Sequence, residues 1–311
     1  MSDPLFFRKR LVLAKLETTY GVDSTPLGAN AILISNLDVT PVDTEFASRE
    51  LVRPYLGNFD DIPVATSVQV SFRVEIAGSG VAGTAPGYGP LLRACGMSET
   101  ITPATSVVYA PVSEGFESLS MRVNVDGIEH VILGARGSVS LEFTTKAIPY
   151  YNFSFTGLYG GVSDVPAVTP VYSQFIKPEG VNAVNTSGFS VHGFAGCLES
   201  MTMDVANQIA FRTLVGCEDV QLTDRLPAGS MVIQAPLTAT KNFFDISNEG
   251  TLGAVTLTHG ITAGNIVELE QPYVQLKSPT YSESDGIVML SMDTMVLPSD
   301  AGNDEFSITV R

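Results

Sequence analysis

The sequence predicts a mainly β protein made of two tandem β-sandwich or barrel-like modules, each with one short helix. The first observation is that apolar and polar residues alternate with a period of two in several segments. The second is that turn residues recur about every 8 to 12 positions, which is typical of all-β folds. The third is that the order of predicted elements is repeated in the two halves of the chain. With 311 residues, 44% of them hydrophobic, the chain is long enough for about two domains.

The clearest element is a β-hairpin at residues 138–158. Its two strands place apolar side chains on one face and Ser, Thr, Asn and Glu side chains on the other, with a break at Pro149 between them. The apolar side chains are Val139, Leu141, Phe143, Tyr151, Phe153 and Phe155. Such a hairpin packs one face on a core and leaves the other face in water.

The rest of the first half continues this pattern. Strands are predicted at residues 31–39 and, by strict alternation, at 67–76. Between them, residues 41–63 are rich in charge and poor in core-like positions, so we predict a long loop or hairpin that projects from the body. A glycine-rich loop at 78–89 leads into a short helix at 90–97 with a proline in its first turn. Further strands are predicted at 107–109, 116–125 and 131–133.

A linker with three prolines at residues 160–178 separates the two halves. We place the boundary near residue 165, which gives a first module at 1–165 and a second module at 166–311. The second half then repeats the order of the first. Residues 203–205 echo 37–39, residues 228–233 echo 65–70, and a charged excursion at 204–227 lies between them; a short helix at 241–247 and strands at 264–276 and 287–296 follow. This order indicates a duplication; the identities are few, so coincidence is the alternative.

The charge balance argues against a protein that binds nucleic acid through phosphates. Lys and Arg number 17 against 33 Asp and Glu, a formal net charge of −16, whereas phosphate binding requires clustered cations. The sequence shows no signal peptide or membrane-spanning stretch. The cysteines Cys95, Cys197 and Cys217 are odd in number and widely spaced, so neither a disulfide framework nor a zinc site is indicated.

One stretch matches a cofactor motif but lacks its context. Residues 78–83 fit the pattern GxGxxG, which binds dinucleotides only where it opens a substantial helix in a βαβ unit. The helix expected here is short and begins several residues later. We therefore predict a flexible connection and no cofactor.

The titratable residues show no catalytic spacing, so we predict that the protein is not an enzyme. The histidines are far apart, with no spacing for a metal pair or for a nucleophile partner. They are His130, His192 and His259. Carboxylates are plentiful, but strand alternation already accounts for a polar side chain at each position considered. These positions are Glu142, Glu268, Glu270 and Asp293.

Two stretches carry a family resemblance. Residues 15–21 read Lys-Leu-Glu-Thr-Thr-Tyr-Gly, and residues 28–33 continue as Gly-Ala-Asn-Ala-Ile-Leu. The segment 203–233 contains Arg-Thr-Leu-Val-Gly at 212–216 and Thr-Asp-Arg-Leu-Pro-Ala-Gly-Ser at 223–230. Together these stretches cover roughly a third of the chain and resemble the tail tube (major tail) proteins of long-tailed siphophages.

The resemblance implies a β-sandwich with a flanking helix that assembles into rings, which stack into a hollow tube through which the genome leaves the capsid. It implies a structural virion protein of the tail, assembled in the host cytoplasm, with the tape-measure and tail terminator proteins as partners and no membrane. DNA would pass through without specific binding. If each half is one module, three chains supply the six modules that other tubes draw from six chains, which favours a trimeric ring with pseudo-sixfold symmetry over a hexamer. A non-viral β-sandwich adhesin or carbohydrate-binding module is the alternative, and the absence of Trp argues against it.

Two sets of charged residues are candidates for the functional surfaces of such a tube. The candidate ring-to-ring contacts, from the two charged excursions, are Arg49, Glu50, Arg53, Asp60, Asp61, Arg212, Glu218, Asp219, Asp224 and Arg225. The candidate lumen residues, on the wet faces of strands, are Glu75, Glu142, Glu268 and Asp293. An acidic lumen would repel phosphates and let DNA slide. The alternative is that these four carboxylates face the outer surface.

Overall fold

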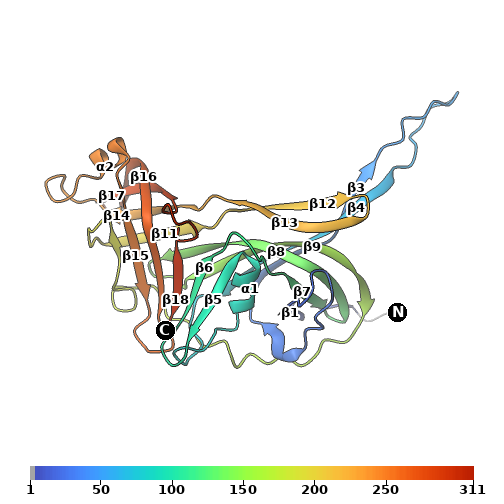
Figure 1. The fold of residues 1–311 in the computed structure, drawn as a ribbon, viewed down its shortest axis with the longest axis horizontal. Coiled ribbons are helices and arrows are strands. Elements are labelled where there is room, and N and C mark those ends of the chain that lie inside the picture. Colours follow the sequence, from blue (N-terminus) through green and yellow to red (C-terminus); the bar gives the residue numbers. More distant parts are fainter. Residues whose placement is uncertain (1–3) are drawn as a thin grey trace.

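The computed structural model describes residues 4–311 and is built almost wholly of antiparallel strands (Figure 1). The strands of the first half are β1 (Arg10–Leu16), β2 (Ala31–Ile32), β3 (Ser35–Ala47), β4 (Ile62–Glu75), β5 (Met97–Thr102), β6 (Ser106–Pro111), β7 (Leu119–Val125), β8 (Ile128–Thr144) and β9 (Tyr150–Asp164). Those of the second half are β10 (Ser190–Val191), β11 (Leu198–Asp204), β12 (Asn207–Leu214), β13 (Cys217–Arg225), β14 (Ala228–Gln234), β15 (Leu252–His259), β16 (Val267–Ser284), β17 (Ile287–Val296) and β18 (Ser307–Val310). The predicted mainly β class is confirmed.

The helices are short, as the sequence predicts. A 3₁₀ turn, η1 (Gly28–Asn30), precedes β2, and the α-helices of the described residues are α1 (Gly89–Ala94) and α2 (Phe243–Glu249). Asn242 caps α2 by accepting the backbone N–H groups of Phe244 and Asp245, and Gly250 ends it at φ 66°, a conformation that glycine adopts without strain. α1 ends three residues earlier than expected because Met97 already begins β5.

One continuous run of strands forms the main wall of the molecule, in the order β3-β4-β9-β8-β11-β14-β17-β16. The predicted hairpin at 138–158 is the β8–β9 pair at its centre, with Val139 opposite Phe153. The second half of β8 then pairs with β11, from Ser140 opposite Asp204 to Thr144 opposite Ser200. The two halves of the chain therefore join edge to edge through β8 and β11.

The two halves have the same order of strand pairing. The order β3-β4-β9-β8 in the first half recurs as β11-β14-β17-β16 in the second. The first part of β8 pairs with β7 as the first part of β16 pairs with β15. A short helix directly precedes β15, and in the first half β5 and β6 lie between the helix and β7. This repetition supports the proposal of two related modules divided near residue 165.

The halves nevertheless share one core. A single apolar cluster runs from Val12 in β1 to Val310 in β18, and β18 pairs with β6 of the first half as well as with β16. Breaking the chain between the halves would expose part of this cluster. The two halves are thus structural repeats that pack as one body.

The loop that matches GxGxxG is a close contact between the halves and not a flexible connection. The backbone N–H of Gly80 donates to the carbonyl oxygen of Gly264 at 3.0 Å, and that of Gly78 donates to the Asn265 side chain at 2.8 Å. A Cβ on Gly78 would overlap the carbonyl oxygen of Gly264. The glycines are therefore required because two backbones approach each other here, which is one of the uses of glycine in loops.

Replacing Gly78 by alanine is expected to destabilise the chain by about 2 kcal/mol, because the new methyl group forces the two loops apart. The measurement is the thermal midpoint of the purified protein, which should fall by several degrees. Gly180→Ala is the matched control, since a Cβ there meets its nearest atom at 3.9 Å. Equal midpoints for the two variants would contradict the close contact.

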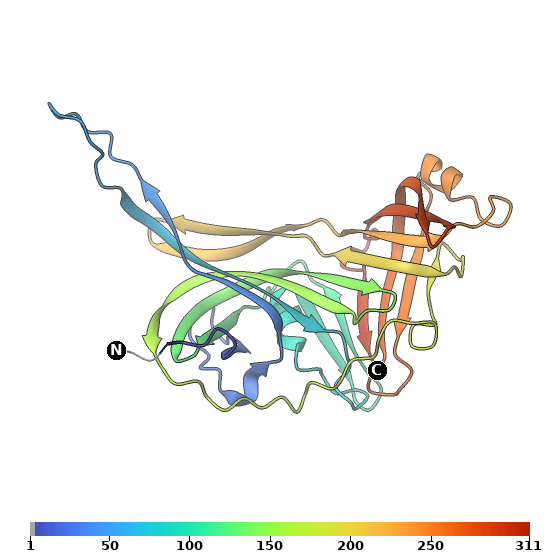
Figure 2. The same ribbon diagram turned by 180° about the vertical axis from the view of Figure 1, so that it is seen from behind.

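The two charged excursions are both hairpins, and they are placed differently. We call residues 41–63 the first arm and residues 205–227 the second arm. The first arm continues the β3–β4 pairing out to Ala47 and Ile62 and projects away from the body (Figures 1 and 2). The second arm, which contains β12 and β13, lies back along β8 and β9 (Figures 1 and 2).

Candidate assembly surfaces

The run of strands ends in two open edges. β3 pairs with β4 on one side, and no strand among residues 4–311 pairs with its other side. Beyond Lys277, β16 pairs with β17 and leaves its opposite edge open over the same part of the chain. Open edges carry unpaired backbone N–H and C=O groups, which are sites for pairing with another chain.

The β8–β11 joint shows how two such edges close in this protein. Phe143 lies opposite Met201 and Leu141 opposite Met203, and each of these side chains is at most 3% exposed. The joint therefore combines backbone hydrogen bonds with apolar pairs that face the core.

The open edge of β16 already carries a side chain suited to such a joint. Tyr281 is 67% exposed, and its ring lies 5.5 Å from the ring of Phe244 on α2. An aromatic ring that stands on the helix-covered side of an open strand becomes buried when a neighbouring strand is added. Tyr281 was not among the sequence-based candidates, because an alternating pattern does not distinguish an edge strand from an inner one.

Three of the four candidate lumen residues share one cross-strand row. Directly opposite residues in antiparallel strands project from the same face of the sheet. The row runs Glu75, Tyr150, Glu142, Thr202, Ser230, Asp293 and Lys277 across neighbouring strands. The structure therefore brings Glu75, Glu142 and Asp293 onto one polar face, although they are far apart in the sequence.

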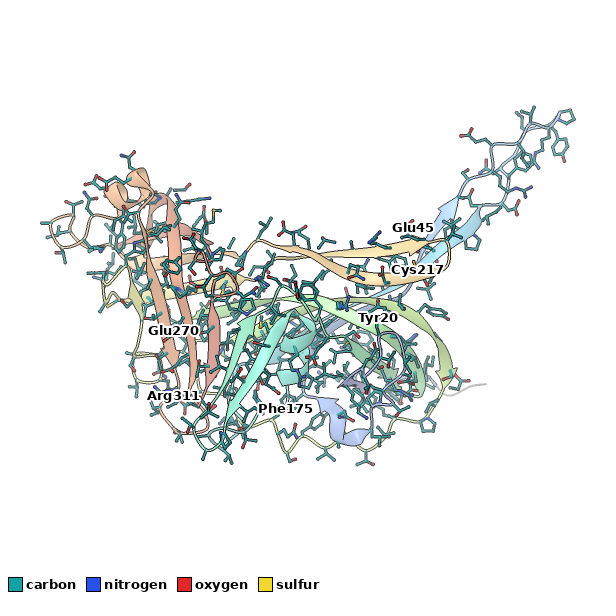
Figure 3. All side chains as sticks on the ribbon, in the orientation of Figure 1. Tyr20, Glu45, Phe175, Cys217, Glu270 and Arg311 are labelled. Atoms are coloured by element: carbon teal, nitrogen blue, oxygen red, sulfur yellow. The ribbon has the colours of Figure 1, made fainter. Side chains whose placement is uncertain are left out.

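Glu268 is placed apart from this row. It lies in the first part of β16, opposite Thr309 of β18, and its carboxylate accepts a 2.6 Å bond from Arg311. Figure 3 shows the neighbouring Glu270 and Arg311 at the lower part of that sheet. Since Glu268 is already paired within the chain, it is a weaker candidate for contact with DNA than the three carboxylates of the row.

A buried group of polar residues holds the second arm on the first half. Arg136 of β8 donates to the carbonyl oxygens of Val220 and Phe116 at 2.8 and 2.9 Å. Its guanidinium stands 4.8 Å from the ring centre of Tyr20, whose hydroxyl accepts the backbone N–H of Val220 at 2.6 Å (Figure 3 labels Tyr20 beneath the arm). Burial raises the pKa of Tyr20, so the hydroxyl stays neutral at physiological pH. Arg136 and Val220 were not among the sequence-based candidates; a lone cation between two glycines in a strand was the available signal.

Glu17 positions this group. Its carboxylate accepts bonds from the hydroxyls of Ser118 and Ser120 at 2.7 and 2.9 Å and from the backbone N–H groups of Gly21 and Gly134 at 2.8 Å. Glu17 thereby ties the turn after β1 to β7 and β8. The Glu-Thr-Thr-Tyr-Gly stretch of the family resemblance thus has a structural role: it holds Tyr20 in place to bind the second arm at Val220.

The candidate ring-to-ring residues lie on both arms. Arg49 pairs with Asp60 at 2.8 Å near the end of the first arm, and Arg53 stacks on Tyr55 and Phe59. On the second arm, the strand register places Arg212 opposite Asp219 and Thr213 opposite Glu218. Of the remaining residues, Glu50, Asp61 and Asp224 are exposed, and Arg225 is largely buried. The Arg225 guanidinium binds Glu305 at 2.6 Å and the carbonyl oxygen of Val112 at 2.9 Å, so it is occupied within the chain.

The histidines lie outside both arms, whereas the exposed Cys217 begins β13 of the second arm. Burial lowers the pKa of each of the three histidines; His259 contacts Thr186 at 2.8 Å and His192 contacts the carbonyl oxygen of Val274 at 3.0 Å. Over residues 4–311, no cluster of His, Cys, Asp and Glu has the geometry to hold a metal ion. In that same range no helix has the length and apolar character needed to span a membrane.

Comparison with known proteins identifies the family. A search of curated protein sequences gives no significant match. The family model described as phage tail tube protein matches residues 8–296, which includes both halves and both arms. The model thus covers the strands that make the open edges, the acidic row and the residues that receive the second arm, and this chain belongs to the phage tail tube protein family.

Proposed function

We propose that three copies of this chain close into a ring with pseudo-sixfold symmetry, and that such rings stack into a hollow tube through which the phage genome is ejected. As a member of the tail tube family, the chain is a structural subunit of the virion tail that assembles with copies of itself. The proposal adds the number of chains, the ring and the channel. Assembly in the host cytoplasm and contacts with tape-measure and tail terminator proteins belong to the same proposal.

The β8–β11 joint is the observation that carries the ring. In the repeated order of strands, β16 stands where β8 stands in the first half, and β3 stands where β11 stands in the second. β8 and β11 pair within the chain, whereas β16 and β3 are the two open ends of the run. Pairing β16 of one copy with β3 of the next would repeat the internal joint and close a cyclic assembly with no edges left.

The acidic row supports the channel. If the polar face of the closed wall points inward, Glu75 and Glu142 of every chain face the DNA, and their charge repels its phosphates. The cations near these carboxylates are Lys277, in the same row, and Arg73, in the next row. Asp204 lies in that next row and adds another negative charge. Weak repulsion with little specific binding suits a conduit that DNA must leave completely.

The mass of one ring tests the proposal. Three copies of the 33.0 kDa chain weigh about 99 kDa, and six copies weigh about 198 kDa. Native mass spectrometry of the purified protein at assembly concentration, combined with electron microscopy, is expected to show a species of about 99 kDa and rings or tubes. A ring of six chains would overturn the trimer, and a monomer at all concentrations would overturn the ring.

A further inference from the structure

The first arm exposes an unusual amount of apolar surface. Val42, Phe46, Ile62 and Val64 are each about half exposed or more, and Val52 and Leu56 near the end of the arm are fully exposed. A projecting hairpin that carries this many apolar side chains is typical of a segment that binds another surface. On the second arm, Val220 and Leu222 are 0% and 8% exposed where the arm lies on the first half, whereas Leu214 and Val215 near its tip are 53% and 108% exposed.

An apolar groove of about 950 Å³ lies at the start of β14 and the end of β17, beside Lys277 in β16, and the segment that follows β6 of the first half also borders it. Its lining includes Leu226, Met295 and Leu297, with Lys277 and Asp293 at one side. Leu226 and Met295 are 59% and 37% exposed in the groove. The groove therefore has the size and the surface to receive several apolar side chains.

The equivalent place on the first half is bordered by the base of the second arm. The space beside Ser154 and Thr156 of β9 is bordered by Asn207 and Ile209 at the base of that arm. The side-chain amide of Asn207 donates to the carbonyl oxygens of Gly137 and Cys95 at 2.9 and 2.7 Å. The second arm, which begins at the end of β11, thus packs beside the strands of the first half, to which β11 is paired.

The repeat of strand order relates these two places. The strands beside the second arm are β4, β9 and β8, and their equivalents β14, β17 and β16 line the groove. The second arm follows β11, which is joined to β8; the first arm follows β3, which in the proposed ring is joined to β16 of a neighbour. The first arm of the same chain points away from its own groove (Figures 1 and 2), so it does not fill it.

We infer that the groove of each copy receives the base of the first arm, around Val42 and Phe46, from the neighbouring copy in the same ring. This inference rests on the proposed ring and adds a contact that stabilises it. The first arm would cover each β16–β3 joint between copies, as the second arm covers the β8–β11 joint within the chain. The arm–groove contact buries apolar side chains from both copies, so it stabilises each joint beyond its backbone hydrogen bonds.

Cross-linking between the arm and the groove tests the inference. The exposed Cys197 and Cys217 are first replaced by serine, while the buried Cys95 is kept. Cysteine pairs are then introduced as Val42→Cys with Met295→Cys, and as Phe46→Cys with Met295→Cys, and the assembled protein is treated with a short bismaleimide. Each chain supplies one arm and one groove, so contacts within a ring are expected to give covalent dimers and a closed trimer, with nothing larger.

The outcomes separate this inference from the ring itself. Species longer than three chains would place the arm in the groove of another ring and overturn the inference. Rings of the expected native mass whose cysteines do not link would overturn it and leave the proposed function intact, whereas the absence of rings would overturn both. The matched control is Val22→Cys with Met295→Cys, because Val22 is 58% exposed and lies outside both arms, so no link above background is expected.

Discussion

Replacing Tyr281 by aspartate is expected to abolish ring formation while the monomer stays folded. Tyr281 is 67% exposed in the chain, so the substitution costs the monomer little beyond its contact with Phe244. In the proposed ring the same side chain lies in the β16–β3 joint, where a buried, unpaired carboxylate costs several kcal/mol. A loss of about 3 kcal/mol weakens each joint about 100-fold.

The measurement is the sedimentation profile of wild type and variant over a range of concentrations, with circular dichroism to check the fold. Wild type is expected to form rings and tubes and Tyr281→Asp to remain a monomer with an unchanged β spectrum. Tyr281→Phe keeps the aromatic side chain and removes only the hydroxyl, so this variant should assemble as wild type does. Normal tubes from Tyr281→Asp would show that the free edge of β16 is not a subunit joint.

Reversing two charges of the acidic row, with Glu75→Lys and Glu142→Lys, is expected to turn a passive lumen into one that holds DNA. Both residues lie opposite Tyr150 in the same row, so the two lysines would stand close together on the polar face. Two lysines in each of three chains would release counterions from DNA, and binding of this kind weakens about 10³-fold between 50 and 200 mM salt.

The measurement is the amount of DNA that stays protected from nuclease when tubes are assembled with linear duplex DNA. Wild-type tubes should protect little DNA at any salt concentration, and the variant should protect it at 50 mM and release it at 200 mM. The pair Asp164→Lys and Glu249→Lys makes the same charge change at exposed positions off the row, so it should not protect DNA from nuclease. Protection that is equal for the two variants would assign the row to the outer surface.

Local patterns were sufficient for most of the strands. The alternation of Val139, Leu141 and Phe143 with polar residues predicts β8, and the structure buries all three to 1% exposure. The first helix is signalled by its proline and the arms by their charge, and each lies within a few residues of the predicted position. These features depend on neighbours in the sequence, which is why they can be recognised without the fold.

Contacts between distant segments could not be predicted in this way. The glycines at 78–83 look like a flexible loop in the sequence, and only the approach of the turn at Gly264 shows that they are packed. The row that unites Glu75 with Glu142 and Asp293, and separates them from Glu268, depends on strand register across both halves. Register is set by the pairing of whole strands, and a shift of one residue would move each carboxylate to the other face.

Composition and period-two alternation were enough to establish an acidic, mainly β chain with two charged excursions, because each of these properties is local or additive. The packed chain alone decided that β8 and β11 meet, that β3 and β16 stay open, and that one arm is seated while the other projects. These outcomes depend on long-range strand pairing and on the shared core, because the packing of the whole chain determines which strands become neighbours.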